Sequence, residues 1–516
     1  MTTRTLAALR HAGSRRQARV AAWWLACLTA VPAAATVAHA QIIAVKTAPI
    51  ADGGQFAFLP SANLGLGGLA IALPDSTLDA FVNPAKGSRL RGTHVFGSPT
   101  FYTVSRGAGG GLTLPVGTSI SSGPWFSQFA IAMQEVEHTG PDDGVLFPTV
   151  ALEGDVPAPF VQDDEPSRRN QYLHATVGRR LSRLGASVAA SASWWSLNAV
   201  DGVELYYPGS QHVRQRGEAL DLRLGLFKEW RGQSLEALVL RNRSGMNQDV
   251  AFADIFWDPS QRQIVQVARF EPNAERTETW GLHLGYTRPL ADSSWRLGGI
   301  VTANRIEQPR LPNYGLPQVP ADEGRAHAYD VGAGISRSGK AWTFGVDAIF
   351  EPIWSRSWDH ARKATETRAG VPIAAGTTTL ANRFRFTNGI LRAGVGTSGV
   401  VTENVSIAFE AGGQLKAVRY RLEQFDAIQL SETASTQSWN EWTRSWGMSL
   451  RFAGADLRYR GSLTTGAGRP GFDDDGPVFT AVDALSSFRP FPAFGVTPFD
   501  DVRVTTHQIS FSIAIR

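Results

Sequence analysis

Alternation of apolar and polar residues constrains the fold of this 516-residue chain more than any other feature. In Leu220–Leu226 every second residue is a leucine, and the residues between them are charged or glycine. The same pattern recurs at 280–286, where apolar residues alternate with glycine and histidine, and at 342–350. A period of two places one set of side chains on each face of a β-strand. The chain is therefore predicted to be all-β.

Three further features favour a membrane-spanning barrel over a soluble sandwich. The alternating segments run to about ten residues or more, which is the length of a tilted transmembrane strand. Aromatic residues gather near their ends, as interfacial girdles do, at Trp230, Trp280, Tyr286, Trp295, Trp342 and Tyr459. Tight connections also alternate with long polar ones, the longest of which are predicted at 138–168, 198–215, 244–275, 307–325, 353–379, 421–435 and 467–500. Short periplasmic turns opposite long outer loops are typical of bacterial outer-membrane barrels.

The strand count is predicted as fourteen, an even number that brings both ends of the barrel to the same side. The expected strands are 125–137, 169–180, 185–197, 216–230, 233–243, 276–288, 294–306, 326–337, 341–352, 380–396, 403–420, 436–453, 455–466 and 503–516. A further hairpin at 92–121 would raise the count to sixteen if it joins the wall. The last strand alternates like a signal for the barrel-assembly machinery, a partner expected during biogenesis, although it ends in Arg516 rather than an aromatic residue.

Residues 1–40 are predicted to be a secretory signal peptide. A basic beginning is followed by the apolar run Val20–Val31 and by Ala38-His39-Ala40, which indicates cleavage between Ala40 and Gln41. The single cysteine of the chain, Cys27, lies in this leader. The leader also holds five of the 50 Lys and Arg, which leaves 45 against 46 Asp and Glu. A nucleic-acid partner is not expected, because no basic excess remains.

No catalytic, cofactor-binding or metal-binding residues are predicted, and an enzyme is not expected. The histidines beyond the leader are not spaced as metal ligands, and no nucleophile elbow or phosphate-binding loop is present. Asp359-His360 is the nearest approach to an acid–base pair, but adjacent residues of an extended chain point apart. Acidic runs such as Asp473–Asp475 could bind hard cations or bridge to lipopolysaccharide, although solvated loops commonly carry such charge.

Several arginines fall on the predicted lumen side of their strands. They could attract an anionic head group, although a wide barrel commonly fills its wet interior with paired charges. Asp221, Asp347 and Asp456 are expected to oppose them. The arginines are Arg223, Arg383, Arg385, Arg392, Arg451, Arg458 and Arg460.

A glycine-rich stretch, Asn63–Ala72, is followed by an aspartate at 75 and by Phe81–Ala85, which contains Asn-Pro-Ala. Glycines allow positive φ and close approach of backbones, and Pro84 prevents a helix from running through Asn83. A compact segment with little regular structure is therefore expected here.

This pattern resembles the N-terminal hatch of FadL-type outer-membrane transporters of long-chain fatty acids, and equally the start of the related PorV-type barrels. The resemblance covers residues 61–85 and implies a hatch at 41–90 that plugs a barrel at 91–516. It assigns the hatch motif to Gly65, Gly67, Gly68, Asn83 and Pro84.

Two functions follow as expectations. The first is passive uptake of hydrophobic small molecules, such as fatty acids or aromatic hydrocarbons, across the bacterial outer membrane without a cofactor. The alternative is a PorV-like surface platform or shuttle that binds secreted proteins and transports nothing. Membrane lipids and lipopolysaccharide are expected partners of either.

Overall fold

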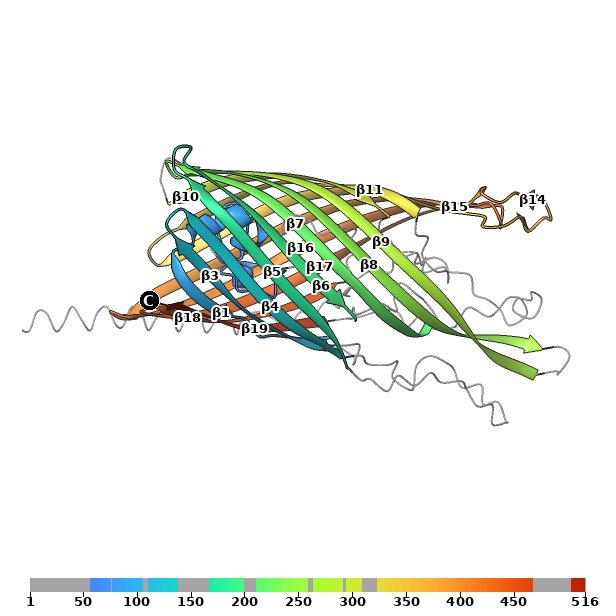
Figure 1. Ribbon diagram of the computed structural model, residues 1–516, viewed down its shortest axis with the longest axis horizontal. Coiled ribbons are helices and arrows are strands. Elements are labelled where there is room, and N and C mark those ends of the chain that lie inside the picture. Colours follow the sequence, from blue (N-terminus) through green and yellow to red (C-terminus); the bar gives the residue numbers. More distant parts are fainter. Residues whose placement is uncertain are drawn as a thin grey trace, which may run out of the picture. The chain divides into compact units, whose positions relative to one another are not determined.

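The chain forms one large antiparallel sheet that closes on itself (Figure 1). The computed structural model describes residues 56–75, 77–104, 110–137, 167–198, 210–258, 263–290, 294–308, 323–466 and 503–515. The wall strands are β1 (Gly92–Gly97), β2 (Thr100–Val104), β3 (Gly110–Ser122), β4 (Trp125–Glu137), β5 (Ser167–Leu181), β6 (Ala186–Leu197), β7 (Ser210–Trp230), β8 (Gln233–Asp258), β9 (Gln263–Pro289), β10 (Trp295–Glu307), β11 (Glu323–Ser338), β12 (Trp342–His360), β15 (Thr378–Thr402), β16 (Val405–Asp426), β17 (Ser431–Phe452), β18 (Ala455–Gly466) and β19 (Arg503–Ile515).

The wall has sixteen strands when β1 and β2 are counted as one, because both pair with β3 on one side and with β19 on the other. The hairpin at 92–121 therefore belongs to the wall, and sixteen rather than fourteen is correct. Closure is direct: Val95 lies opposite Ile513, and Thr103 lies opposite Thr505. No sheet edge is left open in the described wall.

Tight turns gather at one end of the barrel. They join β3 to β4, β5 to β6, β7 to β8, β11 to β12, β15 to β16 and β17 to β18. Gly232 (φ 78°) and Gly454 (φ 94°) supply the left-handed conformation that two of these turns need.

The opposite end differs from the sequence prediction. Most of the expected loop at 244–275 is a β-hairpin, because β8 and β9 stay paired as far as Asp258 and Gln263. The expected loop at 353–379 is likewise shortened, since β12 reaches His360. It carries the two-residue strands β13 (Thr365–Glu366) and β14 (Pro372–Ile373), which pair with each other.

Each wall strand presents an apolar face outwards. On β12 the outward residues Val346, Phe350 and Trp354 are exposed, and Val331 on β11 is 54% exposed. Exposed apolar side chains recur in this way on the strands around the wall. Such a continuous band belongs in a lipid bilayer, so this is a transmembrane barrel. Among the described residues, no helix has both the length and the apolar character needed to cross a membrane.

Residues 56–91, here called the N-terminal segment, fold into three short helical pieces. They are η2 (Leu64–Leu66), α2 (Asp79–Val82) and η3 (Pro84–Arg89). The segment contacts the inward faces of strands on both sides of the barrel, β4 to β7 at η3 and β15 to β18 at η2. It therefore lies across the interior, where Figure 1 shows it in blue.

The outward band predicts the effect of a charge at its middle. We expect Val331→Arg to lower the free energy of unfolding by about 2–4 kcal/mol, because the guanidinium would lie in lipid. Chemical unfolding in phospholipid vesicles measures this, with Val331→Leu as the matched control. An unchanged stability in Val331→Arg would mean that this face does not contact lipid.

Candidate functional site

The glycine-rich turn of the N-terminal segment lies directly against wall backbone. Gly67 has φ 77°, and a Cβ there would meet the backbones of Gly413 and Ala393. The wall is adapted to the turn as well, since a Cβ on Gly394 or Gly412 would collide with the backbone of Leu66. Glycines on both sides therefore allow a close approach that a longer side chain would prevent.

The same edge of the segment is held by hydrogen bonds from the wall. Asp347 on β12 accepts from the backbone N–H groups of Ala70 at 2.8 Å and Ile71 at 3.1 Å. Ser445 on β17 accepts from Gly67 N at 3.0 Å and donates to the carbonyl of Gly65 at 3.1 Å. Gly68, also in the predicted motif, has φ 73° and open space around it.

Within the segment, one carboxylate organises the backbone. Asp75 Oδ2 accepts from Ser61 Oγ at 2.5 Å and from Ala62 N at 2.6 Å, while its Oδ1 accepts from Thr77 N and Leu78 N. These bonds satisfy backbone N–H groups that have no partner in a regular helix or strand.

Asn83 and Pro84 form the other predicted half of the motif. Asn83 is fully buried; its Oδ1 accepts from Ala85 N at 3.2 Å, and its Nδ2 donates to Glu236 Oε2 on β8 at 3.2 Å. Pro84 follows as the first residue of η3. The asparagine side chain thus caps a helical turn and ties it to the wall.

A buried ionic cluster fixes this second edge. Lys86 Nζ lies 2.9 Å from Glu236 Oε2 and 3.5 Å from Asp79 Oδ2. Arg89 adds contacts of 3.6 Å to Asp79 and 3.4 Å to Glu229. One buried lysine therefore serves two buried carboxylates, and the shorter contact goes to Glu236.

Burial raises the pKa of the Asp79 carboxyl to about 6, because desolvation outweighs the attraction of Lys86. Burial alone would lower the pKa of Lys86, but the charges of Asp79 and Glu236 outweigh it and the pKa is raised. The lysine therefore stays charged at neutral pH, whereas the Asp79 carboxyl, with its pKa of about 6, titrates slightly below neutral pH.

Aromatic packing completes this edge. Phe56 and Phe81 are fully buried against β1, β4 and β5. Arg223 on β7 lies 4.7 Å from the centre of the Phe56 ring, pairs with Asp221 at 2.7 Å, and donates to Val82 O at 2.7 Å. A charged wall residue is thus used to hold the segment rather than to face open water.

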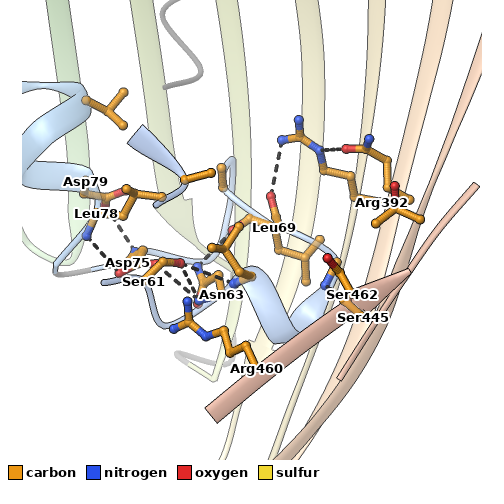
Figure 2. Close-up of a pocket in the computed structure, with 18 of the residues that line it drawn as sticks. Ser61, Asn63, Leu69, Asp75, Leu78, Asp79, Arg392, Ser445, Arg460 and Ser462 are labelled. Carbon is orange, nitrogen blue, oxygen red and sulfur yellow. Dashed lines mark hydrogen bonds between the residues drawn. The ribbon is translucent and has the colours of Figure 1, made fainter. Parts of the chain in front are cut away.

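A cavity of about 340 Å³ lies between the segment and the wall. Its apolar lining includes Leu69, Ile300 and Ile349. Its polar lining includes Arg392 and Arg460, which Figure 2 places on opposite sides of the glycine-rich turn. The wall lining comes from strands β8 round to β2, so the cavity occupies the centre of the barrel.

Arg460 is the most unusual residue of this lining. It is 4% exposed. Its Nη1 donates to Gln508 Oε1 at 3.1 Å, but its Nε and Nη2 have no partner within the described structure. Gln508 in turn donates to the carbonyls of Ala57 and Phe58. The guanidinium is therefore positioned through a residue that also anchors the segment.

The predicted lumen arginines divide into two groups. Arg223 and Arg458 face inwards, and Arg458 donates to Ser61 O at 3.4 Å and pairs with Asp456 at 2.6 Å. Arg451 also reaches Asp456, at 3.6 Å, at the tight-turn end of β17.

The prediction is wrong for Arg383 and Arg385. Both are exposed, and they alternate on β15 with buried Phe384 and Phe386, which share the inward face of Arg392. Since successive side chains of a strand point to opposite faces, the two arginines face outwards.

Sequence reasoning missed the ionic cluster. Lys86 and Asp79 flank the predicted Asn83-Pro84 pair, and the side chain of Glu236 lies on the inward face of β8. Charged residues beside a buried motif were the available signal, but Glu236, the wall partner of Lys86 and Asn83, lies 153 positions from Asn83 in sequence. In the described ranges, no group of three or more His, Cys, Asp or Glu could hold a metal ion.

No protein family matches the sequence, and no curated protein matches it. The fold is similar to that of solved barrels, among them the toluene transporter TbuX of Ralstonia pickettii, with TM-score 0.38, 9% identity and coverage of 88% of this chain and 97% of that one. The monoaromatic hydrocarbon channel CymD has TM-score 0.37, 11% identity and the same coverage. The ferric-catecholate import receptor Fiu of E. coli K12 has TM-score 0.34, 8% identity and coverage of 82% of each chain. Likenesses this distant assign neither family nor substrate.

Loss of the buried lysine should release one edge of the segment. We expect Lys86→Met to lower the free energy of opening of the segment by about 3 kcal/mol, because two buried carboxylates lose their shared cation. Hydrogen exchange of residues 77–90 measures this. Lys363→Met, on an exposed loop, is the matched control, and Lys86→Met/Glu236→Gln should recover part of the loss. Equal exchange in Lys86→Met and wild type would contradict the role of the cluster.

Asp79 should make the docking of the segment depend on pH. Because its pKa is raised from 3.8 to about 6, its contribution to stability is complete below pH 3.8 and is lost as the pH rises through about 6. Hydrogen exchange corrected for intrinsic rates should show stronger protection of α2 at pH 4.5 than at pH 7. The difference should shrink in Asp79→Asn; an Asn variant with the same pH dependence as wild type would refute the assignment.

Proposed function

We propose that this protein is an outer-membrane channel for passive uptake of hydrophobic small molecules, with the N-terminal segment as its hatch. The observation that carries the proposal is an apolar cluster on the inward face of the wall, where a water-filled pore would present polar and charged side chains. The cluster spans β10 to β16 and consists of Ile306, Ala326, Ala328, Ile353, Phe384, Phe386, Val418 and Leu422.

Apolar residues continue from this cluster towards the central cavity. On β12, Ile353 of the cluster and Ile349 of the cavity lining are both buried on the inward face. A polar step separates them, where Glu351 accepts from Asn388 at 2.7 Å and from Lys416 at 3.2 Å. The proposed route for a hydrophobic solute from the long-strand end thus follows apolar wall, one paired polar layer and then the cavity, and the solute must displace the contacts that now bury the apolar side chains.

The segment forms the floor of this path. It lies between the cavity and the tight-turn end, where Arg180 on β5 donates to Ser88 O at 2.7 Å. Passage to the periplasm therefore requires movement of the segment or a sideways exit through the wall. The two edges of the segment are held differently, by close backbone packing on one side and by charges on the other.

The rival function, a surface platform for secreted proteins, is favoured by a different observation. Strands β9 and β15 have 27 and 25 residues, whereas about ten suffice to cross the apolar band. The wall therefore extends well beyond the membrane on one side and could offer a surface to a protein partner.

A reversible crosslink separates the two functions. Ser336 on β11 donates to Ala72 O at 2.8 Å, so Ala72→Cys/Ser336→Cys in a Cys27→Ser background should form a disulfide that fixes the segment to the wall. We expect vesicles containing the reduced protein to take up labelled palmitate, the oxidised protein to take up far less, and reductant to restore uptake.

Ser336→Cys alone in the same background is the control for oxidation, and labelled sucrose is the control for leakage. No palmitate uptake by reduced, fully folded protein would refute the channel and favour the platform. Equal uptake by the oxidised and reduced protein would keep the channel but refute movement of this edge of the segment.

A further inference from the structure

Five outward-facing arginines form a patch on four neighbouring strands. Arg325 on β11 lies directly opposite Arg356 on β12, which lies directly opposite Arg383 on β15. The patch, here called the arginine patch, consists of Arg325, Arg356, Arg383, Arg385 and Arg419.

These arginines lack anionic partners within the described structure. Among the residues that the structure describes, no carboxylate lies within 4.0 Å of any of the five, and all five are exposed. Like charges directly opposite one another on a sheet are destabilising. The register places Glu307 opposite Arg325 and Glu423 opposite Arg383. The printed ion pairs of these glutamates are formed with Arg305 and Arg421 instead. Arg356 lies between two arginines, so the row carries an excess of positive charge that suits an anion from outside the chain.

Flanking arginines at a similar level are paired, which marks the patch as distinct. Arg305 on β10 lies 2.9 Å from Glu307, and Arg421 on β16 lies 3.0 Å from Glu423. Arg241 on β8 lies 2.7 Å from Glu278. The two glutamates that lie opposite the ends of the row, Glu307 and Glu423, are thus engaged by the flanking arginines.

The position of the patch specifies where its anion lies. Along β12, Phe350 and Trp354 are exposed apolar residues of the outward band, and Arg356 and then Trp358 follow on the same face. Trp354 packs against Tyr329 of β11 at 5.5 Å between ring centres, as in an interfacial aromatic girdle. The arginines therefore begin where the lipid head groups begin, at the end opposite the tight turns.

We propose that the arginine patch binds the phosphate groups of a phosphorylated glycolipid, the chemistry of lipopolysaccharide, in the outer leaflet. Arginine presents planar pairs of N–H donors that suit phosphate oxygens. Neighbouring strands lie about 4.8 Å apart, so three consecutive arginines can contact a lipid that carries more than one phosphate. A ligand in the plane of the membrane reaches this outward face beside the apolar band without entering the barrel.

The test measures binding of bisphosphorylated lipid A to the purified protein in neutral detergent by native mass spectrometry and titration. The patch variant is Arg325→Gln/Arg356→Gln/Arg383→Gln. The matched control is Arg241→Gln/Arg243→Gln/Arg276→Gln, which removes the same charge from partnered arginines on β8 and β9. We expect the patch variant to lose about tenfold or more in affinity, the control to lose less than about threefold, and salt to weaken wild-type binding.

Two further probes identify what is bound. Lipid A without its phosphates should bind wild type much more weakly, and inorganic phosphate should not compete at millimolar concentration. Equal binding by the patch variant and wild type, equal binding of phosphorylated and dephosphorylated lipid, or competition by inorganic phosphate would each overturn the proposal.

The patch variant relieves like-charge repulsion and is expected to fold. Circular dichroism melting checks this, and the single variant Arg356→Gln, with an expected loss of a few-fold, replaces the triple variant if its melting is altered.

Discussion

The requirement that no backbone polar group be left unpaired in lipid governs the whole structure. An open sheet would expose a row of N–H and C=O groups to hydrocarbon, at a cost of several kcal/mol for each group. Pairing of β19 with both β1 and β2 removes that edge. Closure then fixes the remaining features, because it separates an outward face that must be apolar from an interior that must be filled.

The N-terminal segment fills much of that interior by two physically different means. Around Gly67 it approaches the wall backbone to backbone, with glycines on both sides. Around Lys86 it brings three charged groups and Asn83 into a buried, hydrogen-bonded cluster with β8. Close packing is insensitive to pH and salt, whereas the ionic edge responds to both, so the two edges have different conditions of release.

Sequence alternation identified the strands and the outward face, because lipid enforces one pattern through the width of the membrane. It failed above the membrane. Arg383 and Arg385 were predicted to face the lumen, but this part of β15 extends beyond the apolar band, and Phe384 and Phe386 occupy its inward face. The alternation of apolar and charged residues is the same beyond the membrane. There, however, the outward face no longer contacts lipid chains, and the inward face is the apolar one.

The candidate site was only partly predictable for a related reason. Glycine, asparagine and proline signal local backbone needs, and Gly67, Asn83 and Pro84 lie in the turn and cap that such residues suggest. Their partners Asp347, Ser445 and Glu236 lie far away in the chain. Such contacts depend on barrel closure and strand register, which no local pattern encodes.

The docking surface of the N-terminal segment has a consequence for assembly. The segment precedes every strand that the structure describes, yet it contacts strands from β4 to β18. Its charged edge requires β8, and its glycine-rich edge requires β15 to β17. It cannot reach its final position until nearly the whole wall exists. The part of the barrel that is synthesised first must therefore be the last to be fixed in place.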